Sequence, residues 1–190
     1  MGPSAPLPSP ILGNIAEICI VTPGIYSTID GLTKLGIGPF QIFEFNSTTV
    51  PRQEHYGKQG TDLFRIKVAF AKQNSLVVEL MQPLPGGSEK SLMQRYLDEN
   101  GGREGVQHIA WDMGEIPMAE RLCRIKDRGF EPAMQGWWMG RKGQCHFCFF
   151  DTLEKGVGTV FETIEFSEDW EDPDCEWYPQ QPVQEDMGEK

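Results

Sequence analysis

The chain has 190 residues, 39% of them hydrophobic, so it can bury one good core and is close to the usual size of a single domain. The formal net charge is −11, but residues 163–190 hold ten of the acids and only one lysine, which leaves the rest of the chain close to neutral. We expect neither nucleic acid nor a membrane as a partner, because no basic cluster could follow a phosphate backbone and no apolar run is long enough to cross a bilayer.

The beginning of the chain and its cysteines both predict a cytoplasmic protein. The segment MGPSAPLPSPILGNI lacks the basic and apolar regions of a signal peptide. Five cysteines form an odd number without the spacing of a disulfide framework. The sequence CHFC at 145–148 lies in a strand-like run where residues three apart point to opposite faces, so we expect buried thiols there and not a zinc knuckle.

The first half of the chain predicts one strand, one helix and three further strands. Residues 14–23 alternate like a strand and end at Pro23, and apolar residues from Ile25 to Leu35 then recur at helical spacing until Gly36 ends the helix. Runs rich in β-branched and aromatic residues at 39–45, 62–70 and 75–82 predict the three strands.

The second half repeats this order after a short connecting helix at about 88–100. A strand is expected at 106–113, a helix at 115–129, and strands at 130–138, 144–150 and 158–166. The same βαβββ unit therefore occurs twice, in modules at about 15–82 and 105–166. This repetition predicts the architecture better than any single motif does.

The repeat divides the chain into an N-terminal extension (1–13), a single domain (14–166) and an acidic C-terminal tail (167–190). The composition of the tail fits a solvated segment. Its aromatic residues Trp170, Trp177 and Tyr178 leave open that it docks on the body or across a dimer contact.

The doubled βαβββ order resembles the vicinal oxygen chelate superfamily, which includes glyoxalase I, methylmalonyl-CoA epimerase, ring-cleaving dioxygenases and bleomycin-resistance proteins. The resemblance is carried by IAEICIVTP and LVVELMQPL, which open and close the first module, and by VQHIAW and GTVFETIEF in the second. It is nearest to epimerase-like members. It implies an α+β fold in which the two modules form a cupped, mostly antiparallel sheet with the helices outside, a small-molecule substrate in the cup, and a homodimer as one assembly.

The resemblance also implies a site where four side chains from the first and last strands of the modules point into the cup. By position these are Glu17, Glu79, His108 and Glu162. Each acid interrupts an apolar strand, and a buried carboxylate needs a cation, a histidine or another acid beside it. This favours a functional His108 over a merely structural ring. His55 and His146 do not match the superfamily's ligand positions, and we expect them to be structural.

The four residues suggest a divalent metal site. Three carboxylates and one imidazole favour Mg²⁺, Mn²⁺ or Fe²⁺, while cobalt, nickel and zinc stay open. Without metal, the three acids could not all remain charged, and an acid with a raised pKa could itself transfer protons. A metal-free acid/base site is therefore the alternative, and no other cofactor site is indicated.

The third strand of the first module decides which reaction the resemblance implies. Epimerase-like members have a second glutamate there, and the matching residue here is Arg65. Arginine stays protonated and cannot be a base, so Arg65 would hold a substrate carboxylate or a developing enolate, or pair with a site acid. One-base chemistry remains: a metal or Arg65 polarises a carbonyl, and Glu162 or Glu79 moves a proton, as in an isomerase, cyclase or lyase. Ring-cleaving dioxygenase chemistry is less favoured, because it needs two histidines.

Aromatic residues on the strands predict the substrate class, a hydrophobic or aromatic carbonyl metabolite such as those of secondary metabolism. The cup would draw its lining from about half of Phe64, Phe70, Trp137, Trp138, Phe147, Phe149 and Phe150, with the two tryptophans beside GRKGQ at its rim and others in the core. Lys67, Arg141 and Lys142 could meet an anion. The alternative function is a non-catalytic binding or resistance protein that uses the same cup.

Overall fold

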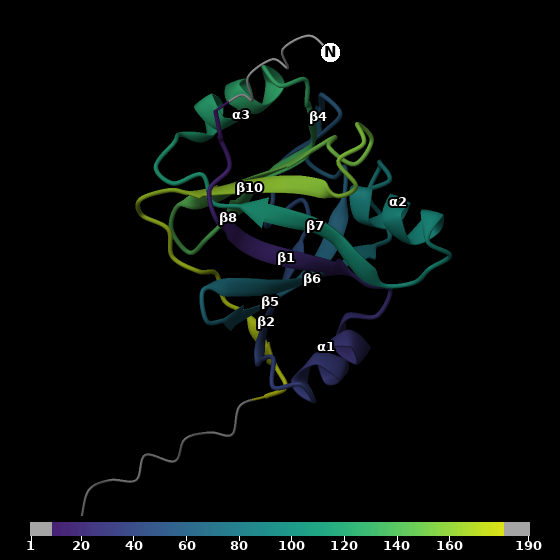
Figure 1. Ribbon diagram of the computed structural model, residues 1–190. Helices are drawn as coiled ribbons and strands as arrows, with labels where there is room; N and C mark the ends of the chain where they lie inside the picture. The colour runs from purple at the N-terminus through teal and green to yellow at the C-terminus, as the bar shows by residue number, and fades with distance from the viewer. Residues whose placement is uncertain (1–8, 181–190) are drawn as a thin grey trace, which may run out of the picture.

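A computed structural model describes residues 9–180, and in this range one sheet of eleven strands is accompanied by three helices (Figure 1). Along the chain, the elements are β1 (Ile15–Val21), α1 (Ile25–Thr33), β2 (Phe40–Phe45), β3 (Arg52–His55), β4 (Lys58–Gly60), β5 (Arg65–Gln73), β6 (Leu76–Leu84), α2 (Leu92–Glu99), β7 (Gly105–Trp111), α3 (Met118–Lys126), β8 (Pro132–Met139), β9 (Gln144–Phe150), β10 (Val160–Phe166) and β11 (Glu176–Tyr178). None of the three helices is long and apolar enough to cross a membrane.

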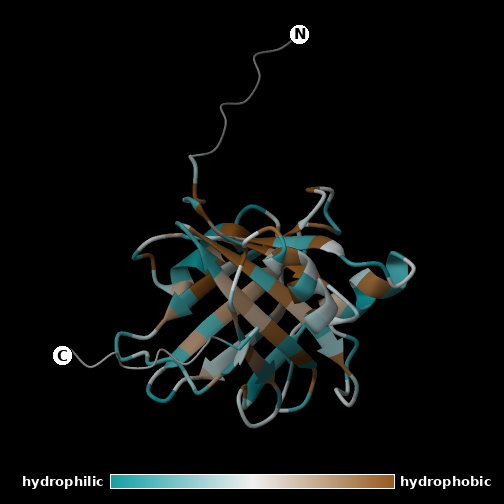
Figure 2. Cartoon of the chain, turned by 90° about the horizontal axis from the view of Figure 1, so that it is seen from below, coloured by the Kyte–Doolittle hydropathy of each residue, from teal (hydrophilic) through white to brown (hydrophobic). Residues whose placement is uncertain are grey.

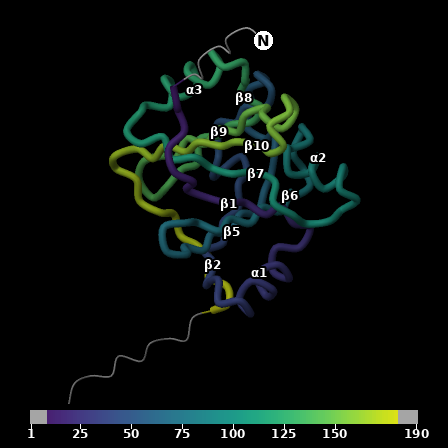
Figure 3. Tube along the Cα trace, viewed as in Figure 1, coloured from purple at the N-terminus to yellow at the C-terminus, as the bar shows by residue number. Residues whose placement is uncertain are grey.

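The predicted α+β fold with a doubled βαβββ unit is confirmed. The sheet order is β11-β2-β5-β6-β1-β7-β10-β9-β8-β3-β4. β2, β5, β6 and β1 of the first module therefore lie on one side, β7, β10, β9 and β8 of the second on the other, and β3 and β4 of the first module extend the second half. Only the pairs β1–β6 and β7–β10 are parallel, which makes the described sheet mostly antiparallel, as expected. The first strands of the two modules, β1 and β7, lie antiparallel at the centre and join the halves (Figure 3).

Helices α1 and α3 cover the outer face of the two halves, because their apolar faces pack on outward-pointing strand residues, whereas Leu92, Met93 and Leu97 of α2 pack in the cluster on the concave side. Ile25 and Ile29 of α1 pack in a cluster with residues of β2, β5 and β6. Met118 and Ile125 of α3 pack with Cys148 and other residues of the second module. The largest cluster is formed by residues of both modules on the concave side. Hydropathy colouring shows apolar residues along the crossing strands and polar ones in the connecting loops (Figure 2).

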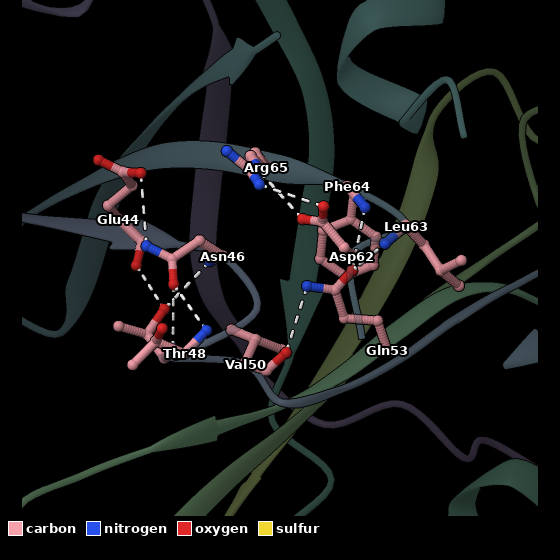
Figure 4. Close-up of polar contacts among 10 residues, drawn as sticks. Glu44, Asn46, Thr48, Val50, Gln53, Asp62, Leu63, Phe64 and Arg65 are labelled. Carbon is pink, nitrogen blue, oxygen red and sulfur yellow. Dashed lines mark hydrogen bonds and ion pairs between the residues drawn. The ribbon is translucent and has the colours of Figure 1, made fainter. Parts of the chain in front are cut away.

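The hairpin of β3 and β4 was not predicted, because its sequence, RQEHYGKQG, has no apolar alternation. It pairs through β3 with β8 of the other module, so its strand conformation depends on a tertiary contact. Tyr56 and Gly57 both have positive φ, which suits the two-residue turn between His55 and Lys58. The buried amide of Gln53 accepts hydrogen bonds from the backbone N–H groups of Leu63 and Phe64 (Figure 4).

Residues 167–178, which we call the C-terminal arm, lie against the body of the protein. The arm leaves the end of β10 and reaches the edge strand β2, where β11 adds to the sheet (Figure 1). On the way, Trp170 stacks on Trp138 at a ring distance of 5.1 Å, and Glu171 forms an isolated β-bridge with Lys142. The aromatic residues of this acidic segment thus dock it on the body as far as Tyr178. The predicted tail continues into residues 181–190, which lie outside the described range, as do residues 1–8 of the predicted extension.

Candidate active site

Three side chains meet in a row across the centre of the sheet, on β6, β1 and β7. Cys19 of β1 is the direct cross-strand neighbour of Glu79 on one side and of His108 on the other. Direct neighbours on adjacent strands point to the same face, so the carboxyl, thiol and imidazole groups share the concave side. All three residues are buried.

Two further acids lie beside this row, one on β1 two residues before Cys19 and one on β10. Glu17 of β1 and Glu162 of β10 are both cross-strand neighbours of Ala110 on β7. Ala110 has only a methyl group between the two acids, so both carboxylates can lean towards this row. The structure therefore brings together Glu17, Glu79, His108 and Glu162, the four residues that the sequence singled out.

His108 is held on three sides. Its Nδ1–H donates to Oε1 of Gln107 at 2.5 Å, and its ring packs edge-on against Phe149. Because an amide oxygen only accepts, Nδ1 carries a proton and Nε2 is the nitrogen that faces the acids. Nε2 lies 2.8 Å from Oε2 of Glu79, and a proton is shared between these two atoms. Oε2 of Glu162 stands at ion-pair distance, 3.3 Å from Nε2.

Burial and mutual repulsion perturb the pKa values of this cluster. Burial lowers the pKa of His108, but the carboxylates of Glu162 and Glu79 outweigh that effect and raise it to about 9. Burial raises the pKa of Glu162 to about 7, against the opposing attraction of His108. Burial, with the charges of Glu79 and Glu162, raises the pKa of Glu17 well above its usual range. Burial and the charge of Glu79 also raise the pKa of the Cys19 thiol well above its usual range.

Two buried carboxylate oxygens of the cluster, Oε2 of Glu17 and Oε2 of Glu162, have no hydrogen-bond partner among the described residues. Buried polar atoms are almost always paired, so Oε2 of Glu17 is free to bind a cation, a proton or a ligand, whereas Oε2 of Glu162 has only its ion-pair contact with Nε2 of His108. Ligand atoms of Glu17, Glu79 and Glu162 lie within 4.8 Å of one another, and so do those of Cys19, Glu79 and His108. The donors present therefore fit a divalent metal.

Cys19 and Gln107 were missed as members of the site. The alternation of residues in the first strand puts Cys19 on the same face as Glu17, and this was the available signal, but a single cysteine in an apolar strand is usually a packing residue. Gln107 precedes His108 in the chain, and only the folded structure shows its side chain bonded to the imidazole.

A cavity of about 370 Å³ opens beside the cluster on the concave face. Its lining is mostly aromatic and aliphatic, and Lys72 is the one cationic residue against four acids. The lining comprises Glu17, Gln41, Phe43, Phe45, Phe70, Lys72, Val77, Glu79, Met81, Trp138, Cys145, Phe147, Glu162, Ile164, Phe166 and Asp172. Asp172 belongs to the C-terminal arm, so the arm forms part of the wall.

Arg65 does not reach this cavity. It pairs in register with Leu84, whereas the residue opposite Glu79 on β5 is Phe70. Five residues of strand separate the two positions, about 16 Å. The Arg65 guanidinium instead binds both carboxylate oxygens of Asp62, at 2.9 and 3.1 Å (Figure 4). The predicted role of Arg65 at the metal or enolate thus needs correction, because the register of β5 and β6 places it beyond the cup.

The three other cations expected near an anion also lie elsewhere. Lys67 stands over the ring of Tyr26 of α1, on the outer side. Arg141 and Lys142 pair with Asp174 and Glu171 of the C-terminal arm. The turn that carries Arg141 and Lys142 therefore holds the arm in place. Among the described residues that line the cavity, Lys72 is the cationic one.

Of the seven candidate aromatic residues of the cup, Phe70, Trp138 and Phe147 line the cavity. Trp137 faces the other way, where it stacks on His146 and under Arg52. Phe150 packs in the cluster under α3, and Phe64 and Phe149 are buried in the concave core. Three of the seven thus line the cavity, in line with the expectation that about half would face inward.

The two remaining histidines lie away from the cluster, whereas Cys145 lines the same cavity as Glu17, Glu79 and Glu162. His146 bonds Oε1 of Gln135, and His55 lies on β3 at the edge of the sheet. Cys145 belongs to the concave cluster and Cys148 to the outer one, so the two thiols of CHFC face opposite ways, as the alternation predicted.

Comparisons with known proteins agree with this architecture. The profile of the Glyoxalase/Bleomycin resistance protein/Dioxygenase superfamily matches residues 17–149. No curated protein matches the sequence. Among solved structures, methylmalonyl-CoA epimerase from Mycobacterium tuberculosis is 17% identical with a TM-score of 0.55, and the match covers 85% of this chain and 93% of that one.

Two further solved structures show the same fold. A Streptomyces coelicolor methylmalonyl-CoA epimerase variant in complex with 2-nitronate-propionyl-CoA is 20% identical with a TM-score of 0.56, covering 85% of this chain and 99% of that one. A variant of 4-hydroxymandelate synthase from the same organism is 12% identical with a TM-score of 0.54. That match covers 82% of this chain and 49% of the synthase. At these identities the likeness concerns the fold alone.

Proposed function

The chain belongs to the glyoxalase/bleomycin resistance protein/dioxygenase superfamily, and from this premise we propose that it is an enzyme in which Glu162 moves a proton next to the carbonyl of an apolar small molecule. The observation that carries the proposal is the buried carboxylate of Glu162 in the wall of the cavity, whose Oε2 has no hydrogen bond and only an ion-pair contact with His108. A base must have a free lone pair within reach of the substrate, and this carboxylate has one.

The protonation state of Glu162 supports this role. A pKa raised to about 7 leaves the carboxylate a stronger base than an ordinary glutamate, yet still ionised in much of the population near neutral pH. His108, with a pKa raised to about 9, stays protonated at that pH in the metal-free protein and can return a proton. The pair provides a base and an acid 3.3 Å apart.

Glu17, Glu79, His108 and Glu162 are also the residues that would hold a divalent cation, with Cys19 beside them. When bound, such a cation supplies Lewis-acid polarisation of a substrate carbonyl. The unpartnered oxygens of Glu17 and Glu162 support this assignment. With or without the cation, Glu162 would be the group that accepts the proton.

Three of the four acids that line the cavity, Glu79, Glu17 and Glu162, lie on β6, β1 and β10, within four adjacent strands of one wall. The fourth, Asp172 of the C-terminal arm, accepts a hydrogen bond from the indole N–H of Trp170, and the cross-strand neighbour of Glu79 on β5 is Phe70, which cannot be a base. We therefore favour proton transfer on one face of the substrate, as in isomerisation, cyclisation or elimination, over two-base epimerisation.

The cavity lining supports a hydrophobic or aromatic substrate with at most one negative charge. Phe43, Phe70 and Trp138 form a contiguous aromatic wall, with ring distances of 4.9 to 6.1 Å. Lys72 is the single cationic residue of the lining. Polyanions such as the phosphates of an acyl-CoA would have to bind outside this cavity, because four acids line it.

The test is exchange of solvent hydrogen into candidate substrates. The protein is incubated in D₂O with methylmalonyl-CoA, an aryl ketone and a cyclic β-diketone, and deuterium incorporation is followed by mass spectrometry. We expect incorporation into an apolar ketone, and a loss of at least about 100-fold in Glu162→Gln, the usual scale of general-base catalysis. Glu44→Gln, an exposed acid on β2, is the matched control and should exchange like the wild type.

Equal exchange rates in Glu162→Gln and Glu44→Gln would overturn the assignment of the base. The alternative function, a binding protein that sequesters an aromatic ligand, rests on the same aromatic wall. It would be favoured by tight binding of an aryl ketone without any exchange in the wild type, and by unchanged affinity in Glu162→Gln.

A further inference from the structure

We propose that Cys19 is a metal ligand at this site, and that the site binds a thiophilic divalent cation such as Zn²⁺ in preference to Mg²⁺. The inference deepens the proposed function, on which it depends only for the place of the cation. A set of glutamates with one histidine had pointed to harder cations.

The geometry places the thiol between the two other donors. Cys19 is the residue on β1 directly opposite both Glu79 and His108, and the ligand atoms of the three lie within 4.8 Å of one another. All three side chains are at most 2% exposed. A cation that binds Nε2 of His108 and Oε2 of Glu79 would therefore have the sulfur of Cys19 within reach.

The thiol distinguishes one half of the cluster from the other. In the internal repeat, Glu17 corresponds to His108, and the residue that corresponds to Cys19 is then Ala110. Glu17 thus has a methyl group as its direct neighbour on β7, whereas His108 has a thiol on β1. A donor for a soft cation is present only on the side of the imidazole.

The chemistry of the donors favours zinc over magnesium. Thiolate and imidazole are preferred ligands of Zn²⁺ and Co²⁺, and Mg²⁺ prefers oxygen and water. Only Nε2 of His108 is available, since Nδ1 is bonded to Gln107, and a fixed outer partner of this kind is typical of zinc-bound histidine. The unpartnered oxygens of Glu17 and Glu162 remain to complete the coordination.

Binding requires that two protons leave the site. The Cys19 thiol loses its proton to become the thiolate, and the proton shared by Nε2 of His108 and Glu79 is released. The all-oxygen set of Glu17, Glu79 and Glu162 would include no sulfur. Spectroscopy can therefore distinguish the two coordination sets, because only one of them contains sulfur.

The experiment uses the full chain, freed of metal with a chelator and kept reduced. Co²⁺ is added without oxygen and without substrate, and the absorption spectrum is recorded. We expect a near-ultraviolet thiolate-to-cobalt charge-transfer band, and X-ray absorption of the Zn²⁺ form should show one sulfur at about 2.3 Å. Because no turnover is measured, failure here would leave the proton-transfer proposal standing.

Variants identify the sulfur. Cys19→Ser should lose the charge-transfer band and bind Zn²⁺ more weakly by more than the roughly 10- to 100-fold cost of losing an outer-shell partner. Cys145→Ser is the matched control, because Cys145 is also buried in the cavity wall but belongs to neither ligand set. It should keep the band and the affinity.

Three outcomes would overturn the proposal: no binding of Co²⁺ or Zn²⁺, a cobalt spectrum without the charge-transfer band, or a band that survives in Cys19→Ser. If Cys19→Ser does not fold, X-ray absorption of the wild-type zinc form decides alone, since a coordination shell of oxygen and nitrogen without sulfur excludes Cys19.

Discussion

Nε2 of His108 lies 2.8 Å from Oε2 of Glu79, although the two residues belong to different modules and β1 runs between their strands. The contact exists because β1 and β7 join the two halves of the sheet at its centre, and the small thiol of Cys19 lets the longer side chains meet across it. The properties of the site therefore depend on how the modules join.

The pair predicts that the metal-free protein becomes less stable as pH rises. His108 has a pKa of about 9 when folded against 6.5 unperturbed, so its contribution is complete below about pH 6.5 and is lost as pH rises towards 9. Glu162 has a pKa of about 7 when folded against 4.5 unperturbed. It also makes the protein less stable as pH rises between these two values, because burial disfavours its charged form. The free energy of unfolding should fall by on the order of a few kcal/mol from about pH 5 to about pH 9.

Urea unfolding in the presence of a chelator measures this change. In Glu162→Gln the residue cannot ionise, so the fall between about pH 5 and about pH 7 should become shallower. The part from His108 should shrink but persist, because the charge of Glu79 still raises the pKa of His108. Stability that rises with pH over this range would contradict the protonation states assigned to the cluster.

Arg65 and Lys72 give opposite predictions, although both are basic residues of β5. Arg65→Gln should bind and convert substrate like the wild type, because its guanidinium contacts Asp62 and lies outside the cavity. Lys72→Gln should weaken the binding of a monoanionic aromatic ligand by about tenfold, the scale of one partly exposed charge interaction. Titration calorimetry with an aryl carboxylate distinguishes the two, and a larger loss in Arg65→Gln would show that the register was misassigned.

Trp137 and Trp138 are adjacent in β8 but face opposite sides of the sheet. Trp138→Ala should weaken binding of anilinonaphthalene sulfonate or an aryl ketone by about tenfold, since its ring belongs to the cavity wall. Trp137→Ala removes a ring stacked on His146 outside the cavity and should change the affinity by less than about twofold. Equal losses in both variants, measured by fluorescence titration, would place the ligand elsewhere.

The C-terminal arm contributes to stability through one of its two tryptophans. Trp170 is half-buried against Trp138 and Phe166, so Trp170→Ala should lower the free energy of unfolding by about 2 to 3 kcal/mol. Trp177 is 42% exposed on the edge strand β11, and Trp177→Ala should cost less than about 1 kcal/mol. Denaturant unfolding compares them, and an arm that only rests on the surface would give the same small loss in both.

The sequence predicted most of the fold because each element carries its own signal. Alternation placed β1, β7 and β9, and helical spacing placed α1 and α3. The hairpin of β3 and β4 had no such signal, since its polar strand exists only through pairing with β8. In the same way, β11 is three residues of an acidic segment that become a strand only against β2.

By itself, the sequence determined the repeated βαβββ order and the four chemically unusual residues, Glu17, Glu79, His108 and Glu162, because acids and a histidine stand out in apolar strands. Only the tertiary structure decided which side chains join them. The pairing of β1 with β6 and β7 brought in Cys19, and the register of β5 with β6 excluded Arg65. Alternation fixes the face on which a residue lies, whereas its neighbours depend on the register between strands that are distant in the chain.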